Sequence, residues 1–110
     1  MVQVNTLSGK ALDLAVAMSE GFKAETWHKK ALTVLFPDAP RFVPFQPSKD
    51  WIHGGQILER EKIRIEPDFP NGWLAMTQVH GTTALEAAMR YYVSTKFGEE
   101  IDLPNFEGEY

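Results

Sequence analysis

Four prolines within a short stretch constrain the fold of this chain more than any other feature. Proline removes a backbone N–H donor and its ring clashes with the preceding helical turn, so no helix can cross residues 37–47. Residues 41–46 can form only an edge strand or an extended loop, since a central strand would need the missing donors. Any helix must therefore lie before or after this stretch, whose prolines are Pro37, Pro40, Pro44 and Pro47.

A first helix is predicted over residues 8–20. Ser8 can cap the free N–H groups of its first turn, and Gly21 can end it in a left-handed conformation. The residues separate into two faces at the helical period, which predicts an apolar face against the core and a polar face in solvent. The apolar face holds Ala11, Leu12, Ala15, Met18 and Ser19, and the polar face holds Lys10, Asp13, Ala17 and Glu20.

The clearest helix is predicted over residues 83–97. Thr83 and Glu86 have the spacing of a capping box, in which each side chain bonds the backbone N–H of the other residue. Glu86 and Arg90 are one turn apart and are predicted to form an outward-facing ion pair. Gly98 is placed to end the helix. The apolar stripe consists of Leu85, Ala88, Met89, Tyr92, Val93 and the aliphatic stem of Lys96.

Strands are predicted between and after these helices. Apolar and polar residues alternate over 22–27, and residues 31–36 are rich in strand-forming types, which favours a hairpin with a turn at 28–30. A helix over residues 24–35 is the alternative that the pattern leaves open. The remaining extended segments are short strands at 63–66 and 73–78, joined by a turn-rich connection, and residues 99–103.

A third helix is predicted over residues 49–62, with Ser48 at its start. Gly54 and Gly55 lie inside it, and a glycine within a helix costs about 1 kcal/mol relative to alanine. Either the helix is kinked at this pair, or another backbone segment comes close enough to exclude a side chain.

The order helix, hairpin, helix, strand, strand, helix predicts a single α+β domain over residues 1–103. A small antiparallel or mixed sheet with about three helices packed on it would bury the apolar face of every helix, and a helix–sheet–helix sandwich is one such arrangement. The 110 residues suffice for one core but not for two. Residues 104–110 are expected to form an acidic flexible C-terminal tail.

Composition narrows the classes of function. The chain has no cysteine, which excludes disulfides and thiolate chemistry and fits a reducing cytoplasm. It has no apolar run near the ~18 residues that span a bilayer and no signal peptide, so no membrane association is expected. The net charge is −4, and the acidity is concentrated in residues 98–110. Because phosphate binding needs a basic surplus, the composition argues against a nucleic-acid partner.

No metal or cofactor site is expected. The three histidines, His28, His53 and His80, are far apart in the sequence and match no known ligand spacing. The segment before the last predicted helix lacks a P-loop lysine and a dinucleotide-binding glycine motif, so no nucleotide cofactor is predicted.

Four segments together resemble the NinX-like proteins of lambdoid phages, in an order and at spacings that cover nearly the whole chain. The most specific is the segment 47–63, where Pro-Ser-x-Asp-Trp is followed by Gly-Gly and Glu-Arg-Glu. The other three are residues 11–17, 73–75 and 83–104. The resemblance implies a protein from the early accessory region of temperate phages and prophages, in a family that has no assigned activity.

Two positions depart from the family pattern. Lys49 and Gln56 stand where Thr and Pro are common in the family. A proline at position 56 would favour a helix that starts there, so two short helices are an alternative to one helix over residues 49–62.

The same segment supplies a candidate interaction surface. A polar and aromatic cluster beside a glycine pair is a place where a ligand or peptide can approach the backbone. In the ordinary structural alternative, Asp50 caps the helix, Trp51 packs in the core and His53 is solvated. The candidate surface consists of Asp50, Trp51, His53, Gly54, Gly55, Glu59 and Arg60.

The sequence shows no catalytic constellation, and the leading hypothesis is a non-catalytic phage accessory protein in the cytoplasm of the bacterial host that binds a host or phage protein. A homodimer is a further expectation, because small domains with exposed sheet edges can pair with themselves. The alternative is a small-molecule binder or a small hydrolase-like enzyme with a site near Asp50, His53 and Glu59.

Overall fold

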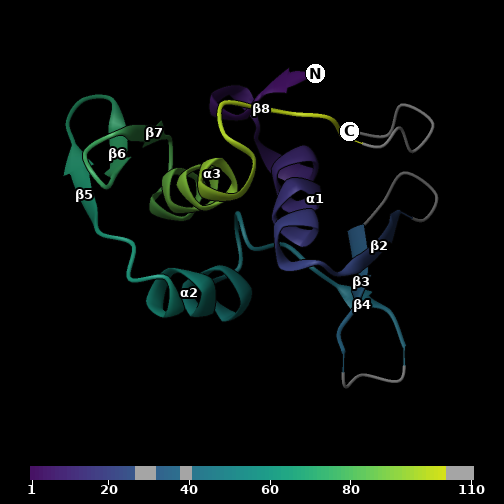
Figure 1. The fold of residues 1–110 in the computed structure, drawn as a ribbon. Coiled ribbons are helices and arrows are strands. Elements are labelled where there is room, and N and C mark those ends of the chain that lie inside the picture. Colours follow the sequence, from purple (N-terminus) through teal and green to yellow (C-terminus); the bar gives the residue numbers. More distant parts are fainter. Residues whose placement is uncertain (27–31, 38–40, 104–110) are drawn as a thin grey trace.

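The computed structural model describes residues 1–26, 32–37 and 41–103. Within these residues the chain forms three α-helices, namely α1 (Gly9–Glu20), α2 (Trp51–Arg60) and α3 (Ala84–Phe97), and a short 3-10 helix, η1 (Val4–Thr6). Helix α3 packs against both α1 and α2 (Figure 1). Among the described residues, no helix is long and apolar enough to cross a bilayer.

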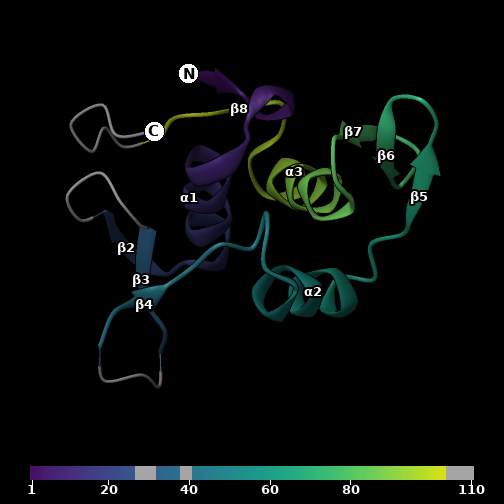
Figure 2. The same ribbon diagram turned by 180° about the vertical axis from the view of Figure 1, so that it is seen from behind.

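The strands form three small antiparallel sheets, and the two three-stranded sheets lie at opposite ends of the molecule with helices between them (Figure 1 and Figure 2). One contains β2 (Lys23–Thr26), β3 (Leu32–Leu35) and β4 (Val43–Pro44), another contains β5 (Ile65–Asp68), β6 (Gly72–Ala75) and β7 (Val79–Gly81), and in the third β1 (Val2–Gln3) pairs with β8 (Glu100–Ile101). The predicted α+β class is confirmed, with the strands spread over three sheets instead of one.

Helix α1 is buried on more sides than its sequence pattern predicts, because it contacts α3, β2 and β3. Asp13 is only 3% exposed and Ala17 is fully buried, so the predicted solvent-facing side of this helix is wrong. The helix ends at Gly21 with a φ of 76°, as expected. Ser8 occupies the N-cap position, but its side chain makes no cap hydrogen bond, contrary to the prediction.

Helix α3 begins with a modified form of the predicted capping box. The Thr83 hydroxyl accepts the Glu86 N–H at 3.1 Å, which confirms one half of the box. The Glu86 carboxylate accepts the Thr82 N–H at 2.8 Å, one residue before the expected donor. The Thr83 cap is therefore present, but the reciprocal bond of the predicted box is made one residue too early.

Arg90, one turn after Glu86, ties three parts of the fold together. It donates to the carbonyl oxygen of Leu7 at 2.7 Å and to that of His80 at 2.9 Å. The Arg90 and Glu86 side chains are 3.4 Å apart and only 14% and 12% exposed. The ion pair therefore exists, but its predicted outward orientation is wrong because Arg90 is held against the backbone of two other segments.

The strands follow the predicted pattern in part. β5 spans Ile65–Asp68 instead of residues 63–66, so Pro67 and Asp68 belong to a strand and not to the predicted connection. β2 pairs antiparallel with β3, which confirms the hairpin, and β4 is the edge strand of the same sheet. The turn proposed at residues 28–30 and the tail proposed at 104–110 lie outside the described residues. The single strand predicted at 73–78 is wrong: Met76 and Thr77 adopt φ values of 51° and 57°, and this turn separates β6 from β7.

Residues 47–62 form a turn followed by one helix. The N–H groups of Lys49 and Asp50 both donate to the carbonyl oxygen of Gln46, so α2 begins at Trp51 and not at residue 49 as predicted. The helix continues through the glycine pair and ends at Arg60. Of the two alternatives that the sequence left open, the single helix is the one observed.

Candidate functional site

Two residues of the candidate surface hold helix α2 in position. The Asp50 carboxylate caps the helix by accepting the Ile52 N–H at 2.9 Å, which is the ordinary capping role. Gly54 faces the core, where a Cβ atom would collide with the carbonyl oxygen of Pro47 and lie 2.9 Å from Cδ2 of Leu85. The close approach of the preceding backbone segment therefore requires this glycine.

The outer surface of α2 carries two large apolar side chains. Trp51 is 57% exposed and Ile52 is 69% exposed, so the alternative in which Trp51 packs in the core is wrong. Gly55 lies one turn later, and a Cβ atom there would be 3.1 Å from Cε3 of the Trp51 ring. Because Gly55 has no side chain, the indole can lie against the helix.

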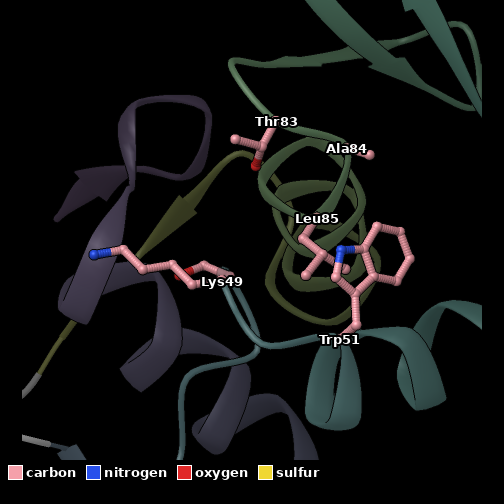
Figure 3. Close-up of a pocket in the computed structure, with 6 residues that line it drawn as sticks. Lys49, Trp51, Thr83, Ala84 and Leu85 are labelled. Atoms are coloured by element: carbon pink, nitrogen blue, oxygen red, sulfur yellow. The ribbon is translucent and has the colours of Figure 1, made fainter.

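A groove lies on each side of Trp51. The first, of about 310 Å³, separates the start of α2 from the first turn of α3, and in Figure 3 the indole lies next to Leu85 while Lys49 points away from it. The second, of about 550 Å³, runs along the outer surface of α2. We call the surface formed by the exposed Trp51 side chain and the grooves on either side of it the Trp51 face. It is defined by Trp51, Ile52, Gly55, Leu58, Glu59 and Leu85.

The other flank of α2 borders a cleft of about 410 Å³, which we call the aromatic cleft. The rings of Phe22, Phe36 and Phe45 contact one another edge to face, with centroids between 4.9 and 5.9 Å apart. His53 lies against Phe45 with ring centroids 5.1 Å apart. Helix α2 lines the cleft with Ile52, His53, Gln56, Ile57 and Arg60.

A charged network lies at the Arg60 end of the aromatic cleft. Arg60 donates to both carboxylate oxygens of Glu20, at 2.8 and 2.9 Å, and through Nε to Glu61 at 2.8 Å. The Tyr92 hydroxyl donates to Glu20 at 2.6 Å and accepts from Arg60 at 3.1 Å. Burial would raise the pKa of Glu20, but the hydrogen bonds from Arg60 and Tyr92 together outweigh it and lower the pKa. Burial and the bond to Glu20 raise the pKa of Tyr92 well above its usual value, so its hydroxyl stays protonated.

The residues that define the enzyme alternative lie on different surfaces. The His53 ring borders the aromatic cleft, with Nδ1 3.8 Å from the Asp50 carboxylate. This nitrogen is buried and makes no hydrogen bond within the described part of the chain, so His53 is not the solvated side chain of the structural alternative. Glu59 lines the outer groove beside Trp51. The structure therefore brings Asp50 and His53 together but separates Glu59 from them.

A buried carboxylate that the sequence interpretation placed in solvent anchors the segment before α2. Asp13 of α1 accepts the Ser48 N–H at 2.7 Å, and both residues are buried. Burial raises the pKa of Asp13 to about 6, although the Ser48 hydrogen bond opposes this shift. An acidic residue within the otherwise apolar run 11–17 was the signal that could have revealed this contact.

Groups that can bind metals are spread over the fold. His53 lies in α2, and His80 lies in β7, where its Nδ1 is 3.1 Å from the Asp68 carboxylate. His28 is outside the described ranges. In the part of the chain that the structure describes, no three His, Cys, Asp or Glu side chains are grouped so that they could hold a metal ion.

Comparison with known proteins identifies the lineage of the chain. The model of the family described as bacteriophage P22 NinX matches residues 3–96. This range includes α1, all of α2 and most of α3, and therefore the whole Trp51 face and Asp13. No curated protein matches the chain significantly. Because the family model covers most of its length, the chain belongs to the NinX family of phage proteins.

Proposed function

We propose that this phage accessory protein is a non-catalytic binding module that recognises a host or phage protein through the Trp51 face. Membership of the NinX family supports the accessory role. The observation that carries the binding role is the exposure of Trp51 and Ile52 at adjacent positions of α2. Exposed apolar surface is unfavourable in water, whereas burying a large apolar side chain in an interface contributes about 1.5–3 kcal/mol.

The grooves beside Trp51 provide the surroundings that a binding anchor needs. Tryptophan is enriched among the interface residues that contribute most binding energy, and such residues lie in well-packed, desolvated positions. Each groove has room for an apolar side chain of a partner beside the indole. Lys49 and Glu59 would then lie at the polar rim of the interface.

Helix α2, which carries the Trp51 face, is held in place by contacts with the rest of the fold before any partner binds. Asp50 caps it, Gly54 fits closely against Pro47, and Asp13 fixes the backbone of Ser48. Side chains that are already ordered lose less conformational entropy on binding. The candidate residues thus differ in role: Trp51, Gly55 and Glu59 supply contact surface, Asp50 and Gly54 position the helix, and His53 and Arg60 line the aromatic cleft.

The geometry gives less support to a small hydrolase-like enzyme. Asp50 is engaged as a helix cap, and Glu59 faces a different groove from His53. General acid–base catalysis needs its groups within hydrogen-bond reach of one substrate. The binding of a small molecule, which the same alternative includes, does not need that arrangement.

Affinity capture tests the proposal. Tagged protein is incubated with lysate of the bacterial host, with and without phage infection, and retained proteins are identified by mass spectrometry. We expect one specific protein to be retained by the wild type and lost by Trp51→Ala. Phe69→Ser is the matched control, because it removes an aromatic side chain that is 95% exposed between β5 and β6. Equal retention by a folded Trp51→Ala variant would contradict the proposal.

Sedimentation equilibrium of the purified protein tests the case in which the partner is a second copy of this chain. A dimer that dissociates in Trp51→Ala would identify the chain as its own partner through the Trp51 face. A dimer that Trp51→Ala leaves intact would show that self-association uses another surface.

A further inference from the structure

The aromatic cleft shares Ile52 and Gln56 with the outer groove of the Trp51 face, but it does not include Trp51. Trp51, Gly55 and Glu59 do not line it, and Ile52 and Gln56 form the ridge between the two surfaces. Its volume of about 410 Å³ is within the range of about 300–1,000 Å³ that is typical of small-molecule sites. The ligand of this cleft can therefore be inferred independently of the protein partner.

The charged groups beside the cleft balance one another. Arg60 donates to the carboxylates of Glu20 and Glu61. Lys96 lies 5.6 Å from the centre of the Tyr92 ring, whose hydroxyl belongs to the same network. Of the described acidic and basic side chains, Glu20 and Arg60 line the cleft itself, and their two mutual hydrogen bonds leave no unpaired charge there to attract an anion or a cation. A phosphate would also approach two carboxylates, so the matching ligand is neutral.

Apolar and hydrogen-bonding groups line different parts of the cleft. On the floor, the half-buried rings of Phe22 and Phe36 offer aromatic surface, against which a planar ring packs favourably, while Phe45 is buried. On the helix side, the exposed Gln56 amide provides one donor group and one acceptor group next to each other. A glutamine amide pairs in two-point fashion with a ring edge that presents an adjacent donor and acceptor, as adenine does.

From this arrangement we infer that the aromatic cleft binds a small neutral molecule with a planar ring and a hydrogen-bonding edge, the chemistry that a free nucleobase and a nucleoside share. The ring packs on the phenylalanine floor, and Gln56 pairs with its edge. The cleft selects against a nucleotide, because Arg60, the cation that lines it among the described residues, is already paired with Glu20 and Glu61.

Titration with a matched ligand series tests this inference. Purified full-length protein is titrated with adenine, adenosine and adenosine 5′-monophosphate, and with the corresponding cytosine and uracil compounds, by calorimetry and by NMR of the backbone amides. We expect binding of at least one base or nucleoside, shifts of the amide signals at residues 52–57, and weaker binding of its monophosphate. The difference between the base and its nucleoside shows which of the two the cleft prefers.

Two variants locate the site. Gln56→Ala should weaken binding by about 5- to 100-fold, the effect of losing a two-point pairing with a base edge. Trp51→Ala should bind the same compounds as the wild type does, since Trp51 does not line the cleft. No binding of any base or nucleoside at millimolar concentration would overturn the inference. Tighter binding of a monophosphate, or unchanged affinity in Gln56→Ala, would also overturn it. Binding of these compounds by Trp51→Ala separates this site from protein capture, because Trp51 lines the Trp51 face and not the cleft.

Discussion

Replacing Asp13 with asparagine tests whether the carboxylate that anchors the segment before α2 is held in an unfavourable environment. Burial raises the pKa of Asp13 from 3.8 to about 6. Because one pKa unit corresponds to about 1.4 kcal/mol, the ionised form lowers the free energy of unfolding by about 3 kcal/mol relative to the protonated form. Asparagine has nearly the same shape, keeps an acceptor oxygen for the Ser48 N–H and does not titrate.

The dependence on pH follows from the raised pKa. Between about pH 4 and about pH 6 the folded protein binds more protons than the unfolded chain does, so this group lowers stability as pH rises through the window. Well below this window the ionisation of Asp13 does not lower the free energy of unfolding, and well above it the free energy is lowered by the full amount. From about pH 4 to about pH 7, the stability of Asp13→Asn relative to the wild type should therefore increase by about 2 kcal/mol, most of the full effect.

Urea unfolding of both proteins at a series of pH values measures this relative stability. Any constant effect of the asparagine amide cancels, since only the change with pH is compared. A relative stability that stays constant across the window would refute the reasoning. It would show that Asp13 ionises in the folded protein as it does in the unfolded chain.

Three further sets of substitutions test packing, the charged network and a strained turn. Gly54→Ala should lower the free energy of unfolding by about 1–3 kcal/mol, because the new Cβ atom collides with the Pro47 backbone. Gly55→Ala should change it by less than about 1 kcal/mol, because the nearest atoms that its Cβ meets are those of the exposed Trp51 indole. Urea unfolding compares the two variants. Tyr92→Phe should lower it by about 1.5–3 kcal/mol at neutral pH by removing the 2.6 Å bond to Glu20. Because the pKa of Glu20 is lowered, this loss should shrink once acid protonates the carboxylate, and a loss that is independent of pH would contradict the assignment. Thr77→Gly should raise the free energy of unfolding by about 1 kcal/mol, because Thr77 holds a φ of 57°; a lower melting temperature would argue against strain at this residue.

Local features of the sequence predicted the C-terminal ends of α1 and α3 and the start of α3. Gly21 adopts positive φ after α1, Gly98 does so after α3, and Thr83 caps α3. Each feature depends on residues within about one helical turn, so the sequence contains the information that determines it. The glycine pair also indicated a close backbone approach, and the structure confirms it at Gly54.

Contacts between distant segments could not be predicted in the same way. Helical periodicity placed Asp13 in solvent because it assumes one buried face, whereas α1 packs against α3 and two strands. Arg60 bonds to Glu20 and Tyr92, which are 40 and 32 positions away, and no local pattern records such a contact. The turn after β6 was missed because a threonine at positive φ is uncommon, and nothing local to Thr77 indicates a turn there.

The candidate site was predicted as one surface because its residues are close in the sequence. A helix with 3.6 residues per turn directs neighbouring side chains to different sides. Arg60 therefore borders the aromatic cleft while Glu59 borders the outer groove. These directions became predictable only when the buried side of α2, marked by Gly54 and Ile57, was known.

The affinity of Trp51→Ala for the captured partner tests the central claim most directly. Calorimetric titration of the purified partner compares the wild type, Trp51→Ala and the control Phe69→Ser. We predict that Trp51→Ala weakens binding by about 30-fold or more, which corresponds to the loss of an interface residue that contributes at least about 2 kcal/mol. Phe69→Ser should bind as the wild type does. Equal affinities of Trp51→Ala and the wild type would contradict the account, because the partner would then bind a different surface.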